Sequence, residues 1–209
     1  MSFDKLTNRN IFFKEMEREV LELINPETGE PFDDLIEEVD CPSCDSDDKS
    51  FFLKKWGFLY NKCHNCKLIY VSPRLTESAT IDLYRKGSEA NKLWALNVMD
   101  SDFQKEYNEI YFKEQLAVLR SFKDRGKLLD VGCGNGHFLK CARDADFDVE
   151  GVELGESAVK IAMSNGLKIR KLLLTDVDLN RDKFDVISMF GVLEHLLQPS
   201  RDMEIVHSM

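Results

Sequence analysis

From residue 127 onward, short apolar runs alternate with stretches of helical periodicity. The apolar runs predict four strands, and the stretches between the first three predict two helices: strands 128–131, 149–152, 168–172 and 185–189, helices 138–143 and 156–164. Strands that alternate with helices form a parallel sheet with right-handed crossovers. Because ligands bind such sheets at the carboxyl ends of the strands, we expect a ligand site at that edge.

The pattern before residue 127 is different, with longer helical stretches and very short strands. Apolar residues at three- and four-residue intervals predict helices over 11–23, 76–86 and 103–122, the second of them capped by Thr76. Aromatic and apolar runs bounded by turn residues predict short strands at 51–53, 56–60 and 68–71. These strands are too short to bury a core of their own.

Four of the six cysteines form two pairs with the same internal spacing. The pairs are Cys41 with Cys44 and Cys63 with Cys66, and eighteen residues separate them. This spacing is typical of a four-thiolate zinc site. Two disulfides, or reduced cysteines without a role, are the alternatives, and disulfides are disfavoured in a cytoplasmic protein. His64, inside the second pair, is interpreted as a bystander.

The predicted zinc ion is structural, because four thiolates leave no ligand position for water or substrate. Short strands around two such pairs make a zinc ribbon, whose folding free energy comes largely from the metal. The chain is therefore predicted to comprise a helical segment, a zinc ribbon, a helical connector and an α/β domain, over residues 1–40, 41–75, 76–126 and 127–209.

Composition and charge disfavour two classes of protein, those that span a membrane and those that bind nucleic acid. The 209 residues are 43% hydrophobic and 32% charged, with a formal net charge of −10, as expected for a soluble globular protein. No apolar run reaches the roughly 20 residues that span a bilayer, and no signal peptide is visible, so we expect a cytoplasmic protein. Residues 1–66 hold 8 Lys or Arg against 15 Asp or Glu. That balance disfavours binding to nucleic acid, which relies on basic side chains.

Three glycines follow the first predicted strand at alternate positions. Gly132, Gly134 and Gly136 come directly after an apolar run that contains Asp130. Glycine permits positive φ and lets a ligand approach the backbone. The NAD fingerprint requires a third small residue where His137 stands, and no P-loop lysine follows. The pattern therefore favours a nucleotide-like ligand other than NAD or a nucleoside triphosphate.

The turn resembles the first motif of the class I S-adenosylmethionine-dependent methyltransferases, a strand followed by D/E-x-G-x-G-x-G. The residues from Asp130 to Gly136 match every specified position. The resemblance implies that the methionyl part of the cofactor lies against Gly132, Cys133 and Gly134. It also implies that Asp130 anchors the cofactor's ammonium group.

The other cofactor motifs of that family are matched in order along the chain. Glu153 stands at the end of the second strand, where the family's acid accepts the ribose hydroxyls, with Leu154 beside it. The family's adenine contact follows the third strand, and Asp176 and Val177 are the residues expected to make it. Phe190, after the fourth strand, is expected to line the methionyl side.

The whole chain also resembles a bacterial subgroup in which a zinc ribbon precedes this domain. The run over 63–70, followed by Pro73 and Tyr84, carries that resemblance. Where the subgroup often has glycine after each cysteine pair, Asp45 and Lys67 stand here, and they must tolerate a left-handed conformation. The subgroup includes methyltransferases that act on nucleotide-linked sugars. It implies a small-molecule acceptor.

A base is needed if the methyl acceptor must lose a proton. His195 follows the fourth strand, and histidine titrates near neutral pH, so it is the candidate; a purely structural role is the alternative.

The segment after the fourth strand lacks two motifs of nucleic-acid methyltransferases. A related RNA-methylating group binds a divalent ion here through an acidic residue, and this chain has Gly191 at that position, which disfavours a catalytic metal. The motif of enzymes that methylate amino groups of nucleic acids is absent too, so both observations favour a small-molecule acceptor. Cys133 and Cys141 are interpreted as small core residues.

The family's sheet has seven strands, and this sequence stops at Met209, in the helix after the fourth. We therefore expect a fragment of a longer protein: an α/β, partial Rossmann-like sheet of strands 1 to 4, preceded by a helical segment and a small zinc ribbon. Strand 4 would be an exposed edge through which chains self-associate. Besides a methyltransferase of small molecules, an RNA-modifying enzyme and a noncatalytic cofactor-binding protein stay open.

Overall fold

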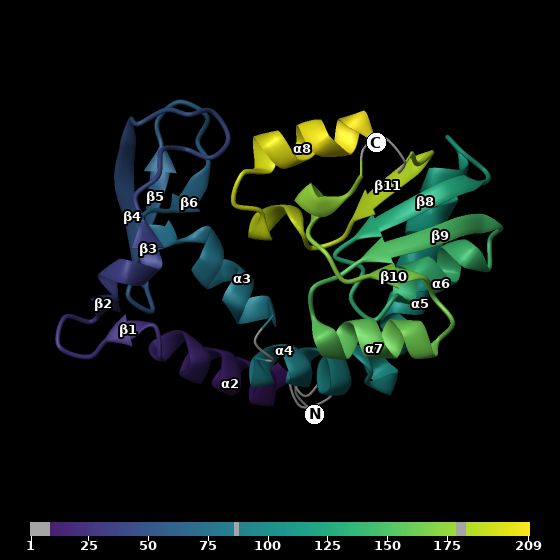
Figure 1. The fold of residues 1–209 in the computed structure, drawn as a ribbon, viewed down its shortest axis with the longest axis horizontal. Helices are drawn as coiled ribbons and strands as arrows, with labels where there is room; N and C mark the ends of the chain where they lie inside the picture. Colours follow the sequence, from purple (N-terminus) through teal and green to yellow (C-terminus); the bar gives the residue numbers. More distant parts are fainter. Residues whose placement is uncertain (1–8, 86–87, 179–182) are drawn as a thin grey trace.

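Two sheet-containing regions lie at opposite ends of the molecule, with helices between them. The computed structural model describes residues 9–85, 88–178 and 183–209. A small antiparallel sheet forms one end and a parallel sheet the other (Figure 1). Helix α3 (Glu77–Arg85) runs between them, and α2 (Arg9–Leu21) lies along one side together with α4 (Glu89–Leu93).

The parallel sheet has the strand order β10-β9-β8-β11, which is 3-2-1-4 in the order of the chain, as the resemblance to the methyltransferase family implies. Its strands are β8 (Gly126–Val131), β9 (Phe147–Val152), β10 (Ile169–Arg170) and β11 (Val186–Met189). The crossover helices α6 (His137–Arg143) and α7 (Glu156–Ser164) follow β8 and β9. The α/β fold is confirmed. Among the described residues β11 pairs with β8 alone, and self-association at that edge stays a prediction.

Both faces of this sheet are covered by apolar side chains, because alternate residues of β8 point to opposite sides. Leu128 packs with α6 and with α5 (Asp102–Arg120), which supplies Phe112 and Leu116. Leu129 packs on the other face, against residues of the loop after β10 and of α8 (Pro199–Ser208). The sheet and its first turn are thus held by a core on each side.

The antiparallel sheet carries the four paired cysteines at one end. It consists of β4 (Lys49–Lys55), β5 (Phe58–Cys63) and β6 (Ile69–Val71) in that order. All three overlap the strands predicted from the sequence. Trp56 and Gly57, predicted as part of a strand, form the β4–β5 turn with φ of 48° and 82°.

Several short elements that join the two ends have no counterpart in the prediction. They are the strands β1 (Ile24–Asn25), β2 (Glu30–Pro31), β3 (Ile36–Glu37) and β7 (Arg74–Leu75), α4 itself and the π-helix η2 (Trp94–Met99). β3 pairs with β7, which closes the chain around the cysteine region. Single 3-10 turns lie at Asp33–Leu35, Leu174–Asp176 and Leu193–His195.

Polar contacts tie the antiparallel end to the segment after β11. The Arg74 guanidinium pairs with Glu37 at 3.0 Å and donates to the carbonyl of Leu197. The Ser200 hydroxyl of α8 lies 3.4 Å from the Pro42 carbonyl, inside the first cysteine pair. The segment after β11 and helix α8 therefore connect the cysteine-bearing region to the parallel-sheet region.

The observed bounds differ from the predicted ones mainly at the ends of elements. The first helix begins and ends two residues earlier than predicted, and the third strand of the parallel sheet shrinks to two residues. Residue 86, predicted to end the second helix, lies outside the described residues. Across the described ranges, every helix is too short or too polar to cross a membrane. The four domain boundaries and the cytoplasmic location stay predictions.

Candidate functional site

The turn after β8 adopts a backbone that needs glycine. Gly132, Gly134 and Gly136 have φ of +64°, +52° and +77°, in the left-handed region where a Cβ is unfavourable. A Cβ on Gly132 would lie 2.6 Å from Val192, and one on Gly136 would overlap Leu167. A Cβ on Gly134 would meet nothing within 4 Å. The outer glycines thus permit close packing, whereas the middle one leaves open space beside the backbone.

Alanine substitutions should separate these two roles. Gly136→Ala adds both strain and overlap, so we expect it to lower the free energy of unfolding by about 2–4 kcal/mol. Gly134→Ala adds strain alone, so its cost should be about 1–2 kcal/mol. Urea denaturation of the two variants measures the difference. Equal losses would show that the turn is not packed as described.

Asp130 lies directly before this turn and is buried, at 3% exposure. The Ser188 hydroxyl of β11 donates a hydrogen bond of 2.7 Å to its carboxylate. Burial raises the pKa of Asp130 to about 7; the Ser188 hydrogen bond opposes this rise and the charge of Glu153 adds to it. Burial of the ionised Asp130 carboxylate therefore costs folding free energy, and a neighbouring cation would reduce that cost.

Glu153 follows β9 and bridges the glycine turn and the next loop. Its carboxylate accepts backbone N–H groups of Gly134 at 2.9 Å, Leu154 at 2.8 Å and Gly155 at 2.7 Å. Three donors from two segments fix the carboxylate beside the open face of the turn. This is the place that the sequence predicts for it.

A cavity of about 1230 Å³ lies between the carboxyl ends of the parallel strands and helices α2 and α3. Most of the predicted site residues line it: Asp130, Gly132, Cys133, Gly134, Glu153, Leu154, Phe190 and His195. The ring of Phe190 packs edge-on against Phe112 and Phe138, with centroids 5.1 and 4.7 Å away. The strand ends thus gather side chains that are far apart in the sequence.

The two residues predicted to contact adenine lie elsewhere. Val177 is 5% exposed and belongs to the core beneath the sheet. Asp176 is exposed, and its carboxylate accepts the Leu173 N–H at 3.2 Å. The part of this segment that lines the cavity is 172–175 instead. The irregular chain after β10 has no periodicity from which this could be read.

His195 contacts a side chain that was not predicted from the sequence to belong to the site. The Tyr84 hydroxyl of α3 lies 3.1 Å from its Nδ1, and both residues line the cavity. Burial raises the pKa of Tyr84 above its ordinary value, so the phenol is neutral at physiological pH. Tyr84 belongs to the run that carries the subgroup resemblance, which was the available signal.

Two further side chains of the turn reach the π-helix η2. Asn135 Nδ2 donates to the carbonyl of Ala95 at 2.8 Å, and His137 Nε2 donates to that of Met99 at 3.1 Å. Burial lowers the pKa of His137. His137, which stands where the NAD fingerprint requires a small residue, therefore forms a hydrogen bond that anchors η2.

The four paired cysteines converge although the pairs are far apart in the sequence. Their sulfur atoms lie within 4.8 Å of one another, with Cys41 and Cys66 at 3.4 Å and Cys44 and Cys63 at 3.6 Å. All six cysteines of the chain are free thiols. Backbone N–H groups of Cys66 and Asn65 lower the pKa of Cys63 to about 6, which favours the thiolate that binds metals, whereas burial raises the pKa of Cys41 to about 12.

The residues around the cluster support its shape. Asp45 and Lys67, which follow the pairs, have φ of 55° and 70°, as predicted for positions where glycine is common. His64 is turned toward β4: its Nδ1 lies 2.8 Å from Asp48 and its Nε2 lies 2.9 Å from Ser50. These contacts agree with the prediction that His64 is not a ligand.

A family model described as a methyltransferase domain matches residues 103–209, just over half of the chain. The chain belongs to this family. The matched range runs from α5 to the end of α8 and includes the glycine turn, Glu153 and His195. The cysteine cluster and helices α2 to α4 lie before it.

Individual relatives of this methyltransferase domain are distant. An uncharacterized protein of Methanocaldococcus jannaschii is 28% identical over 52% of this chain and 54% of its own length. A ubiquinone biosynthesis O-methyltransferase of Pseudomonas syringae is 30% identical over 40% of this chain and 39% of its own. The chain thus spans about half the length of the first relative and less of the second.

Among solved structures, magnesium protoporphyrin IX methyltransferase from Synechocystis with bound S-adenosylmethionine is similar to this chain. It has a TM-score of 0.47 and 16% identity, and the match covers 63% of this chain and 68% of that one.

Proposed function

We propose that this chain binds S-adenosylmethionine and transfers its methyl group to a small molecule. The observation that carries the proposal is the joint position of Gly134 and Glu153 on one cavity wall, in a domain of the methyltransferase family. The backbone at Gly134 is open to a ligand. A fixed carboxylate beside it suits the two hydroxyls of a ribose.

The described residues fit the proposed cofactor along its length. Asp130 offers a buried carboxyl group; burial raises its pKa to about 7, and a cation beside it would favour the carboxylate. Gly132, Cys133 and Gly134 would lie along the methionyl part. When bound, S-adenosylmethionine supplies a methyl group on a positively charged sulfur, which an aligned nucleophile displaces in line.

The chain itself would supply a proton acceptor at His195. If Nδ1–H donates to the Tyr84 oxygen, the imidazole is fixed with the lone pair of Nε2 free. That nitrogen can accept a proton from a hydroxyl or amino group of the acceptor. The hydrogen bond of 3.1 Å to Tyr84 holds the ring in the cavity. Tyr84 would then be a positioning residue.

For the acceptor we propose a nucleotide-linked sugar. The proposal follows the subgroup resemblance, and the volume of about 1230 Å³ supports it, since this exceeds what one nucleoside-sized cofactor needs. The formal net charge of −10 disfavours RNA as the acceptor. Incubation with S-adenosyl[methyl-³H]methionine and a panel of nucleotide-linked sugars tests the proposal. Label should move into a sugar, and transfer into RNA alone would reject it.

Replacement of the proposed base should separate chemistry from binding. His195→Ala is expected to leave cofactor affinity within about twofold and to lower kcat at least 100-fold, the usual range for loss of a general base. Tyr84→Phe should lower kcat less and keep the same cofactor affinity. Label transfer and equilibrium dialysis measure the two effects. An unchanged kcat in His195→Ala would remove the histidine from the mechanism.

We also propose that the cysteine cluster binds one structural zinc ion. Four sulfurs within 4.8 Å fit the first shell of a tetrahedral ion with Zn–S bonds of about 2.3 Å. Two of the four cysteines, Cys41 and Cys63, are fully buried, so the metal would replace a core that this small sheet lacks.

A further inference from the structure

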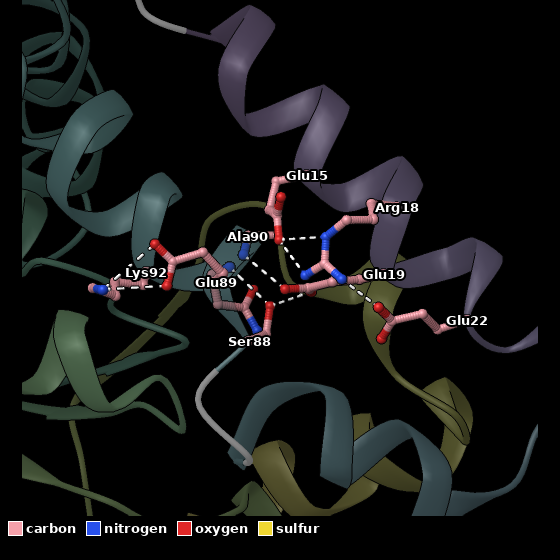
Figure 2. Close-up of polar contacts among 9 residues, drawn as sticks. Glu15, Arg18, Glu19, Glu22, Ser88, Glu89, Ala90 and Lys92 are labelled. Carbon is pink, nitrogen blue, oxygen red and sulfur yellow. Dashed lines mark hydrogen bonds and ion pairs between the residues drawn. The ribbon is translucent and has the colours of Figure 1, made fainter.

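Helix α2 touches the rest of the molecule through one carboxylate in particular. None of its thirteen residues is fully buried. Glu19 accepts the Ser88 hydroxyl at 2.5 Å and the Ala90 N–H at 3.0 Å (Figure 2). The Ser88 hydroxyl oxygen in turn accepts the Asn91 N–H at 3.0 Å. A side chain of α2 thereby satisfies the start of α4, where backbone amides lack helical partners.

The helix that Glu19 caps continues into a segment that is hydrogen-bonded to the glycine turn and to the start of α6. α4 continues into the π-helix η2, whose carbonyls at Ala95 and Met99 accept hydrogen bonds from Asn135 of the turn and from His137, the first residue of α6. Such π-helical segments occur often at functional sites. α4 and η2 also contact α7, the helix after Glu153. The α4–η2 segment thus touches both parts of the protein that are proposed to hold the cofactor.

We propose that Glu19 is a positioning residue. By holding the start of α4, and through it η2, it fixes the conformation of the glycine turn and so raises the affinity for the cofactor. This inference rests on the proposed function. Glu19, Ser88 and Ala95 themselves line the cavity, so the segment is one of its walls. Without the Glu19 contacts the start of α4 would fray, and the carbonyls that hold Asn135 and His137 would lose their fixed position.

Other contacts would keep α2 in place when this carboxylate is removed. The rings of Phe12 and Trp94 pack with centroids 4.9 Å apart, and the Arg9 guanidinium lies 5.6 Å over the Trp94 ring. A substitution at Glu19 is therefore expected to loosen the start of α4 while α2 stays packed against the rest of the protein.

A matched control lies directly after the end of α2. Arg18 forms ion pairs with Glu15 and Glu22 (Figure 2), and the Glu22 side chain is 63% exposed. Such an exposed pair contributes little to stability. Glu22→Ala therefore makes the same chemical change one residue after the end of α2 without touching α4. Glu19→Gln keeps a carbonyl oxygen that can accept a hydrogen bond but loses the charge.

Hydrogen exchange on the ligand-free chain tests the coupling without any cofactor. In Glu19→Ala, peptides that cover 88–99 and 130–137 should exchange at least about tenfold faster, which corresponds to loss of a charge-assisted hydrogen bond. Glu19→Gln should lie between Glu19→Ala and the parent chain, and Glu22→Ala should match the parent. Faster exchange over 88–99 with an unchanged turn would overturn the proposal.

Equilibrium dialysis with S-adenosylhomocysteine tests the consequence for binding. Glu19→Ala should weaken binding about tenfold, and combination with Asn135→Ala should add much less than a second full effect, because both act through η2. Parent-like affinity in Glu19→Ala contradicts the proposal. If the parent chain does not bind, the proposed function fails, whereas the exchange measurement still decides whether Glu19 sets the turn.

Discussion

Asp130→Asn should make the ligand-free protein more stable at pH 8 and at the same time prevent it from binding S-adenosylmethionine. The carboxyl group is buried and its pKa is raised from 3.8 to about 7. Asparagine keeps the shape and the contact with Ser188 but carries no charge. It therefore removes the cost of burying a carboxylate, together with the attraction for a cationic ligand.

The sign of the effect on stability follows from proton linkage. Because Asp130 binds its proton more tightly in the folded state, the unfolded state loses the proton first as the pH rises. The contribution of Asp130 to stability thus falls between about pH 4 and pH 7. A shift of this size corresponds to about 4 kcal/mol. Asp130→Asn should gain that amount at pH 8 and nothing below pH 4.

Thermal and urea denaturation at pH 4 and pH 8 measure this difference, with the exposed Asp148→Asn as the control. Equilibrium dialysis should show that Asp130→Asn binds S-adenosylmethionine at least about tenfold more weakly, the loss of one charge-assisted contact. Affinity of the parent chain should rise from pH 6 to pH 8, as Asp130 ionises. A variant that loses stability at pH 8 would show that the carboxylate is already compensated in the free protein.

Removal of the metal should unfold the cysteine-bearing end of the molecule. Zinc sites of this type contribute about 10–16 kcal/mol of binding free energy, which is folding free energy for a small ribbon. Cys63→Ser is expected to lose the ion and the fixed structure of β4, β5 and β6. Cys141→Ser is the control, since Cys141 is a free thiol on α6, outside the cluster.

Zinc analysis and the fluorescence of Trp56, which lies in the β4–β5 turn, measure this effect. The parent chain and Cys141→Ser should each contain one zinc ion, and Cys63→Ser none. Addition of a strong chelator to the parent chain should reproduce the fluorescence change of Cys63→Ser. A metal-free parent chain with an ordered ribbon would refute a structural zinc ion.

The sequence was sufficient for the features that depend on local pattern and spacing. Apolar runs and helical stretches predicted a parallel sheet, and the family resemblance implied its strand order and the position of Glu153 beside the glycine turn. The cysteine spacing predicted a cluster that the structure brings together. In each case a short motif determines the geometry, so no distant contact has to be known.

Features that arise from distant contacts could not be predicted. The two-residue strands β3 and β7 pair across the whole cysteine region, and strands this short show no alternation. The contact between Tyr84 and His195 depends on how α3 lies over the sheet. Val177 resembles a residue of a cofactor motif, yet it fills the core because the chain after β10 turns inward.

Calorimetric titration with S-adenosylhomocysteine decides whether the glycine turn and Glu153 form a cofactor site. The parent chain should bind one equivalent, Glu153→Ala should lose at least about 100-fold in affinity, and the exposed Glu109→Ala should bind like the parent. Absence of binding by the parent chain, or unchanged affinity in Glu153→Ala, would contradict a cofactor site at the glycine turn.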